Sequence, residues 1–299
     1  MGTGAEKVGN GLDHRARVVA LVLAGGVLLL YWGILMSLGR QWASDDNYSH
    51  GFFVLPLAAF FVWERRAALR LAPARPSWLG LAVIAFSLLL LVAGRLGAEL
   101  FLTRISLIGV LAGITLFVWG WAHLRIVAFP IAFLLLMVPP PAIIFNKLAF
   151  PLQLLASQVG ETVIAAAGIP VVREGNVLQL PTRDLEVAEA CSGIRSLVSL
   201  VMLAVVLGYF TERRNGAHVL IALAAVPIAI AANAARVAGT GLASELVSPA
   251  AADGFFHSFS GWLMFVVAFA ALMLVQRLIG WRPGGRGRKL TPQAGMEAG

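Results

Sequence analysis

The sequence predicts an all-α polytopic membrane protein with about eight transmembrane helices and a small extracytoplasmic β-hairpin element before the sixth helix. Hydrophobic residues make up 59% of the 299 residues and charged residues only 13%, whereas a soluble domain usually carries about 25% charged residues. Apolar runs recur from end to end, and a segment in lipid must satisfy its backbone as a helix or a closed barrel. The runs are continuous rather than alternating, which favours helices.

Eight apolar runs define the predicted spans. They are Val18–Leu38, Gly51–Trp63, Trp78–Ala93, Ile105–Trp121, the run from Ile126 to the triple proline Pro139–Pro141, Ile194–Phe210, Ala217–Ala235 and Phe259–Ile279. The segment Ala142–Gly168 is apolar but interrupted by polar residues, so we predict an amphipathic stretch that lies in the interface or re-enters the membrane. The domain organisation expected is a cytoplasmic tail over residues 1–17, a single transmembrane domain over 18–280, and a disordered basic tail over 281–299.

Charge counting predicts the orientation of these spans. With the N-terminus in the cytoplasm, every short inside loop is basic, as the positive-inside rule requires. The inside pieces hold most of the 23 basic residues, namely Lys7, Arg15, Arg17, Arg65, Arg66, Arg70, Arg75, Arg125, Arg213, Arg214, Arg277, Arg282, Arg286, Arg288 and Lys289. We therefore expect both termini to be cytoplasmic. This distribution explains the net charge of +8 without a nucleic-acid partner.

The outer segment of residues 168–190 differs in kind from the apolar runs. Two short β-like runs, Pro170–Arg173 and Val177–Leu180, flank Glu174-Gly175-Asn176, which is typical of a hairpin turn. A third extended run, Asp184–Val187, leads toward the only cysteine of the chain. We expect a small β element that rests on the outer membrane face.

The predicted topology brings three sequence-distant residues to one depth on the outer face. Cys191 lies at the start of the sixth span, Arg236 at the end of the seventh and His257 at the start of the eighth. A thiol, a guanidinium and an imidazole together suggest nucleophilic catalysis on an acyl group. The thiolate attacks a carbonyl, the histidine moves protons and the arginine holds the developing oxyanion.

The local sequence favours an activated thiol at Cys191. An apolar helix begins just after Ser192-Gly193, and the positive end of a helix dipole lowers the pKa of a nearby thiol. Arg195 follows one turn later, on the same helix face as Cys191 if both are helical. The negative charges of Glu186 and Glu189 disfavour a thiolate, so these residues are instead candidates to bind Arg195, Arg236 or His257. The alternative is that Cys191 is a small buried core residue, the usual fate of a free cysteine.

Other polar residues have competing interpretations. Arg236 can snorkel to the headgroups, but Asn233 shares its helix face, and polar residues on one face of an apolar helix usually point into the protein. The outer segment that contains Tyr48, Ser49 and His50 is either an ordinary polar loop or part of a substrate cleft. His50 is therefore a rival to His257 as the base.

Several motifs in order resemble those of an exosortase, of the exosortase/archaeosortase family, over about Asp45 to Ile279. They are NYSHG (47–51), the proline-rich segment 138–141, GNVLQLP (175–181), EVAEACSGIRSL (186–197), ANAARV (232–237) and FFHSFSGW (255–262). The family's proposed catalytic cysteine, arginine and histidine fall on Cys191, Arg236 and His257.

The resemblance implies a membrane transpeptidase or cysteine protease of the bacterial inner membrane, with its active site on the periplasmic face. Family substrates are membrane-anchored proteins that end in a Pro-Glu-Pro motif, one transmembrane helix and a basic tail, the PEP-CTERM architecture of exopolysaccharide and biofilm systems. Attack by Cys191 would form a thioester, which then passes to an unknown acceptor nucleophile. Arg195 or Arg173 would meet the glutamate of the motif.

Two alternatives stay open at this stage. A multispan exopolysaccharide transport or assembly protein would explain the spans but gives no reason for Cys191. A plain membrane cysteine protease shares Cys191, Arg236 and His257 and differs only in passing the acyl group to water. No cofactor or metal site is expected, because neither the histidines nor the carboxylates have ligand spacing. The expected partners are the membrane-anchored substrate proteins, the acceptor and the lipid bilayer.

Overall fold

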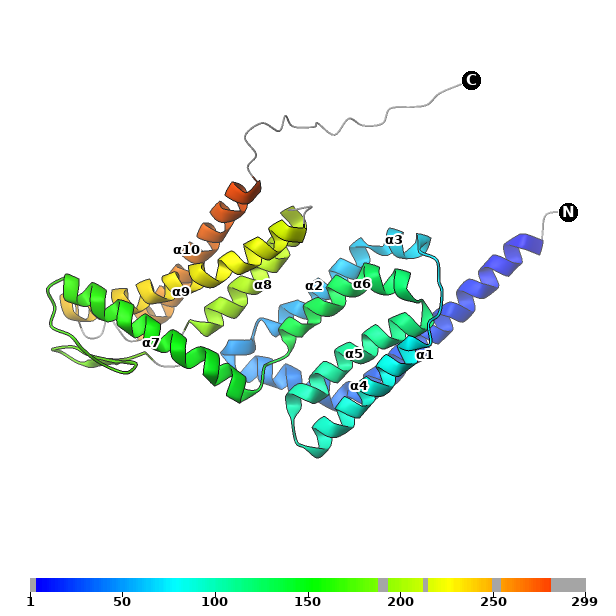
Figure 1. Cartoon of the computed structure of the whole chain (residues 1–299), viewed down its shortest axis with the longest axis horizontal. Helices are drawn as coiled ribbons and strands as arrows, with labels where there is room; N and C mark the ends of the chain where they lie inside the picture. Colours follow the sequence, from blue (N-terminus) through cyan, green and yellow to red (C-terminus); the bar gives the residue numbers. More distant parts are fainter. Residues whose placement is uncertain (1–3, 188–192, 212–214, 249–253, 281–299) are drawn as a thin grey trace, which may run out of the picture. The chain divides into compact units, whose positions relative to one another are not determined.

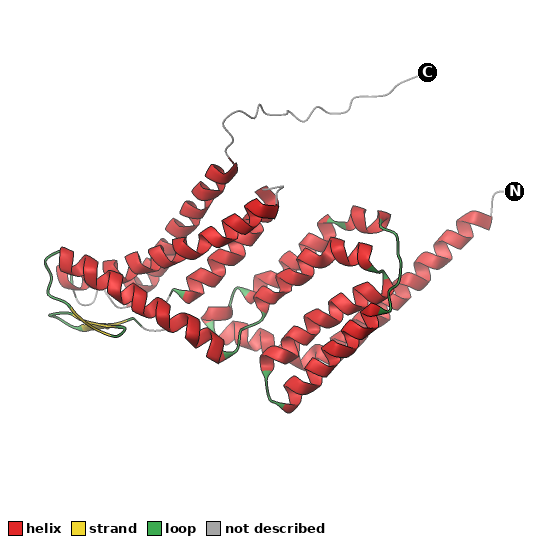
Figure 2. Cartoon of the chain, in the orientation of Figure 1, coloured by secondary structure: helices red, strands yellow, loops and turns green. Residues whose placement is uncertain are grey.

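The computed structural model describes residues 4–187, 193–211, 215–248 and 254–280, and for residues 4–20, 215 and 254–258 the backbone alone. Within these residues the chain is almost entirely helical, and the strands are confined to one short segment (Figure 2). The structure confirms the predicted all-α class with a small β element. The predicted disorder of residues 281–299 lies outside the described residues.

The chain forms two compact units, Met1–Leu148 and Ala149–Gly299. Helix α7 (Ala142–Ala166) begins in the first and ends in the second. The first unit also contains α1 (Gly4–Ser44), η1 (Asp46–Tyr48), α2 (Gly51–Glu64), α3 (Arg66–Leu71), α4 (Leu79–Leu96), α5 (Leu100–Val118), α6 (Trp121–Phe133) and η2 (Leu134–Met137). The second contains β1 (Val172–Glu174), β2 (Val177–Gln179), β3 (Asp184–Glu186), α8 (Ile194–Thr211), α9 (Asn215–Leu246) and α10 (Gly254–Gly280) (Figure 1).

Seven helices in the described part of the chain are long and apolar enough to cross a membrane. The segment Trp121–Met137, which consists of α6 and η2, is apolar but shorter. This agrees with a multispan membrane protein, but the set of long helices differs from the prediction. The run Gly51–Trp63 forms only the 14-residue helix α2. The segment Ala142–Gly168, predicted to be amphipathic, forms the continuous 25-residue helix α7 despite its internal Pro151. Apolar helices tolerate such prolines when neighbouring groups satisfy the freed backbone.

In the first unit, α4 and α5 form a closely packed antiparallel pair (Figure 1). Glycines permit the close approach. A Cβ added at Gly80 would lie 2.3 Å from the backbone nitrogen of Phe117, and one at Gly94 would lie 2.8 Å from Cγ2 of Thr103. Small residues let helix backbones approach within a membrane, where packing rather than water exclusion drives association. Any larger residue at Gly80 would force the two helices apart.

In the second unit, α8, α9 and α10 pack together around small side chains (Figure 1). The buried cluster contains Leu200 and Ala204 of α8, Ile221, Ala225 and Ala229 of α9, and Ala268 and Leu272 of α10. Residues four apart share one face of a helix, so the alanines of α9 form a narrow stripe along which its neighbours approach closely. This bundle positions the polar residues described below.

The β element forms an antiparallel three-stranded sheet in the order β1-β2-β3, with Arg173 opposite Leu178 and Leu178 opposite Leu185. The turn between β1 and β2 consists of Gly175 and Asn176, and Gly175 has a positive φ of 63°, a conformation that favours glycine. The predicted hairpin is therefore confirmed in position and in its turn. Leu178 anchors the sheet in a buried cluster with Ile164 of α7 and Val237 of α9.

Candidate active site

Helix α9 is longer than the predicted span, and this changes the position of Arg236. The predicted span ends at Ala235, whereas α9 continues to Leu246. Ten residues of α9 follow Arg236, which is roughly 15 Å of helix, so Arg236 lies inside the helix rather than at its outer end. The extension is held by tertiary contacts that the sequence pattern does not reveal. Gly241 packs on Ile164, and Glu245 accepts a hydrogen bond of 3.2 Å from the backbone nitrogen of Thr182.

The guanidinium of Arg236 lies against the backbone of α10. A Cβ added at Gly261 would lie 3.3 Å from Cζ of Arg236. Both residues line a cavity of about 10 Å³ together with Ser196 of α8 and Asn233, which is room for about one water molecule. Arg236 is half-buried. The absence of a side chain at Gly261 is what allows the cation to lie between α8, α9 and α10.

Asn233 lies on the same face of α9 as Arg236 and contacts the turn that precedes α8. Its side chain is 6% exposed, and it lies three residues before Arg236, on the same helix face. A Cβ added at Gly193 would lie 2.6 Å from Cγ of Asn233, and Gly193 has a φ of 77°. Only glycine suits both demands. The turn that starts α8 therefore packs directly on Asn233.

The nucleophile and base proposed from the sequence are only partly within the described region. Cys191 and Glu189 lie outside the described residues. His257 lies in the first turn of α10, four residues before Gly261, but its side chain is not among the described ones. Residues four apart lie on one face of a helix. The backbone of His257 thus shares a face with the glycine that contacts Arg236.

The two arginines suggested as carboxylate partners differ in their surroundings. Arg195, the second residue of α8, is half-buried near Gly193 in sequence. Arg173 of β1 already forms an ion pair with Glu161 of α7, with Nε 2.9 Å from Oε2, and donates a second bond to the carbonyl of Gly175. Arg173 thereby ties the hairpin to α7, and the role of both arginines toward a substrate carboxylate stays a prediction. Glu186 ends β3 and is exposed.

Tyr48 and His50 belong to the first unit, and their predicted place beside Cys191 stays a prediction. His50 is 7% exposed, and its Nε2 donates a hydrogen bond of 3.0 Å to the carbonyl of Leu136. Burial lowers the pKa of His50, although hydrogen bonds to backbone oppose the shift. The ring of Tyr48 lies 6.0 Å from that of Phe145. These contacts tie η1 and the start of α2 to their own unit, and the choice between His50 and His257 as the base stays a prediction.

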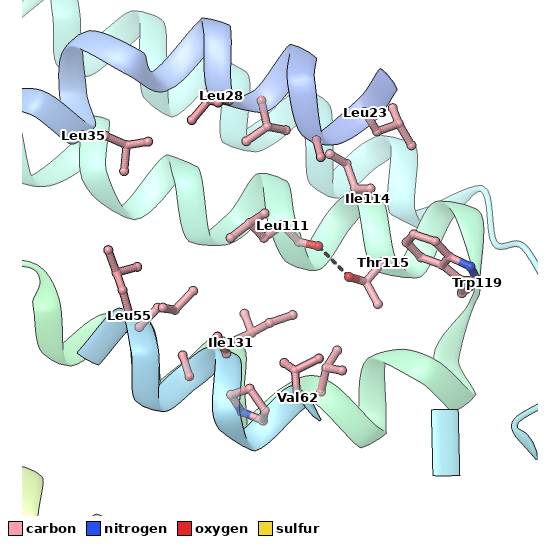
Figure 3. Close-up of a pocket in the computed structure, with 17 residues that line it drawn as sticks. Leu23, Leu28, Leu35, Leu55, Val62, Leu111, Ile114, Thr115, Trp119 and Ile131 are labelled. Carbon is pink, nitrogen blue, oxygen red and sulfur yellow. Dashed lines mark hydrogen bonds between the residues drawn. The ribbon is translucent and has the colours of Figure 1, made fainter. Parts of the chain in front are cut away.

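A cavity of the first unit has almost only apolar walls and no group that could take part in this chemistry. Its volume is about 500 Å³, and its walls are almost wholly aliphatic side chains from α1, α2, α5 and α6 (Figure 3). The hydroxyl of Thr115 donates to the carbonyl of Leu111 at 2.8 Å (Figure 3). None of the site residues predicted from the sequence lines this cavity. Among the described residues, no group of three or more His, Cys, Asp or Glu side chains is placed to hold a metal ion.

Comparison with known proteins places these features in a family. The chain matches the family described as transmembrane exosortase (Exosortase_EpsH) over residues 42–274, more than three quarters of its length. No curated protein and no solved structure matches the chain. The matched region includes α2 to α9, most of α10, the sheet and every residue of the candidate site. The chain is therefore a multispan membrane protein that belongs to the transmembrane exosortase family.

Proposed function

We propose that this protein is a cysteine-dependent membrane transpeptidase that cleaves C-terminal Pro-Glu-Pro sorting signals of exported proteins. Cleavage takes place at the outer face of the bacterial inner membrane, and the product passes through a thioester to an acceptor. Cys191 is the nucleophile, His257 the proton carrier and Arg236 the group that stabilises the oxyanion. Family membership makes a transpeptidase or protease the expected class of activity.

One observation supports the proposal: the Asn233–Arg236 face of α9 contacts Gly193, the residue before α8, and Gly261, the eighth residue of α10. Asn233 packs on Gly193, and Arg236 packs on Gly261. Cys191 is two residues from Gly193 along the chain, and two residues span at most about 7 Å. His257 is one helical turn from Gly261. These contacts support a site in which the three groups act beside the Asn233–Arg236 face.

The chemistry follows from the properties of these groups. The thiolate of Cys191 attacks the carbonyl carbon of the scissile peptide bond, and the electron pair moves onto the oxygen, where Arg236 stabilises the charge. When the C–N bond breaks, the protonated His257 gives its proton to the leaving amine, and a thioester remains on Cys191. An acceptor amine then attacks the thioester, loses its proton to His257 and releases Cys191. Water in place of the amine would make the enzyme a protease.

Substrate recognition is expected from two groups. The carboxylate of the Pro-Glu-Pro motif would form a charge-assisted bond with Arg195 at the start of α8, because arginine matches carboxylate geometry with two parallel bonds. Glu186 and Glu189 would orient the cationic groups of the site. The transmembrane helix of the substrate would pack against the apolar helices, with its basic tail on the cytoplasmic side.

The test is co-expression with a membrane substrate that ends in a Pro-Glu-Pro signal, a helix and a basic tail. Wild type is compared with Cys191→Ala, Arg236→Gln, His257→Ala and the control His50→Ala, and the substrate is followed by gel shift and mass spectrometry. We expect shortening with wild type and His50→Ala only. Product mass separates transfer to an amine from hydrolysis. Equal substrate processing by wild type and Cys191→Ala would refute the thiol mechanism and would favour the transport or assembly alternative.

A further inference from the structure

A polar cavity of about 320 Å³ lies at the end of the α4–α5 hairpin, away from the large aliphatic cavity of the same unit. The polar side chains that line it are Ser37 of α1, Arg95 of α4, and Thr103 and Arg104 of α5. Its remaining walls include the apolar residues Ile34 and Leu100. Two guanidinium groups therefore line one cavity between helices that are long enough to cross a membrane.

Arg104 is the unusual member of this set. It is only 3% exposed, and its Nε atom is buried without a hydrogen-bond partner in the described part of the chain. Glu99 and Tyr48 act on it electrostatically, but no described carboxylate lies within the 4.0 Å of an ion pair. The carboxylate of Glu99 instead accepts a hydrogen bond of 3.0 Å from the backbone nitrogen of Leu102. Arg104 is thus a buried cation without a direct anionic partner among these residues.

A buried charge is costly unless it is paired, which is why arginines inside membrane proteins normally have a partner or a ligand. Arg95, which is exposed, adds a second positive charge, and its Nη2 donates a hydrogen bond of 3.3 Å to the carbonyl of Leu30. The two guanidinium groups and the hydroxyl of Ser37 supply several hydrogen-bond donors to the same cavity. Guanidinium donors match the oxygens of phosphate with parallel hydrogen bonds. The missing partner is therefore an oxyanion.

We propose that this cavity binds the phosphate group of an anionic membrane phospholipid. Arg104 is the fifth residue of α5, and a long arginine side chain near the end of a transmembrane helix reaches toward the headgroup level. The apolar walls at Ile34 and Leu100 suit the adjoining part of the lipid. Inorganic phosphate carries the same chemistry and is the other possible source. The site is independent of the thiol chemistry proposed for the second unit.

The test uses the full chain purified in detergent, with Arg104→Met and the control Arg70→Met. Arg70 is an exposed arginine of α3 outside the cavity, so its variant removes the same charge at another place. Each protein is titrated with phosphatidylglycerol, phosphatidylcholine or inorganic phosphate. Binding is followed by thermal unfolding and by native mass spectrometry of retained lipid. Cys191→Ala is included and should bind like wild type, which separates this proposal from the proposed catalysis.

We expect phosphatidylglycerol to raise the unfolding temperature of wild type and Arg70→Met, and its affinity to fall about tenfold in Arg104→Met because a charge-assisted bond is lost. Phosphatidylcholine should have little effect. Competition by inorganic phosphate that depends on Arg104 would support the site and extend it to the free anion. Without phospholipid, Arg104→Met should be as stable as wild type, because the charge then lacks a partner. Equal retention of phosphatidylglycerol by wild type and Arg104→Met, or a lower stability of Arg104→Met that no anion changes, would overturn the proposal.

Discussion

Replacing Gly193 by alanine tests the contact that joins α8 to α9. The new Cβ would lie 2.6 Å from Cγ of Asn233, closer than the 3.0 Å that real Cβ atoms essentially never cross. Overpacking of this kind costs about 1–3 kcal/mol. The positive φ of Gly193 adds about 1–2 kcal/mol for any L residue. Together they lower the free energy of unfolding by about 2–5 kcal/mol.

A second glycine separates these two contributions. Gly168 has a φ of 82°, but a Cβ there would meet nothing within 4 Å. Gly168→Ala should therefore cost only the backbone strain of about 1–2 kcal/mol. Each kcal/mol lowers the midpoint of thermal unfolding by about 2–4 °C for a chain of this size. Thermal unfolding in detergent, followed by tryptophan fluorescence, should show a distinctly larger decrease for Gly193→Ala.

The double variant Gly193→Ala/Asn233→Ala sharpens the test, because removal of the asparagine side chain relieves the steric part and leaves the strain. The coupling energy of this cycle should be about 1–3 kcal/mol, within the range found for residues in contact. Gly193→Ala should also abolish substrate processing, since it displaces the segment that follows Cys191. If Gly193→Ala and Gly168→Ala are equally destabilising, Gly193 does not pack on Asn233 and the proposed site loses its main support.

Three further predictions follow from the contacts of individual residues. Gly261→Ala places a Cβ 3.3 Å from Cζ of Arg236, so the flexible arginine should shift by a few tenths of an ångström. Processing should then fall about tenfold or more, with thermal stability nearly unchanged, and an unaltered processing rate would contradict the role of Arg236. Burial lowers the pKa of His50, so the unfolded state binds more protons below about pH 6.5. Stability should therefore decrease as the pH falls through 6.5 toward the lowered pKa, and His50→Gln should flatten this dependence in thermal unfolding measured across pH. Arg173→Met removes an ion pair whose side chains are 30% and 35% exposed, and such exposed pairs contribute about 0.2–1 kcal/mol. A decrease in midpoint of more than a few degrees would show that Arg173 does more than tie the hairpin to α7.

The class of fold could be predicted because it depends on local properties of the chain. Long apolar runs must form helices in lipid whatever their neighbours are. The hairpin was equally local, since Gly175 adopts the positive φ that its turn needs. The order of motifs was sufficient to predict the family that the match over residues 42–274 shows. Each of these inferences used the sequence alone and needed no knowledge of which distant segments are in contact.

The positions that the sequence did not predict depend on contacts between distant segments. The predicted seventh span ended at Ala235, yet packing of Gly241 on Ile164 and the bond from Thr182 to Glu245 carry α9 on to Leu246. Arg104 precedes the predicted span Ile105–Trp121, and only the packing of α1, α4 and α5 buries it.

The candidate site divides in the same way. The sequence by itself predicted Cys191, Arg236 and His257 as the residues of the proposed acyl-transfer chemistry. The tertiary structure alone decided that Gly193 and Gly261 meet the Asn233–Arg236 face of α9. The physical reason is that these two contacts are so close that only glycine, which has no side chain, fits without moving the neighbouring group. The sequence alone does not show which segment lies beside a glycine, so it does not show which glycines are required for a close contact.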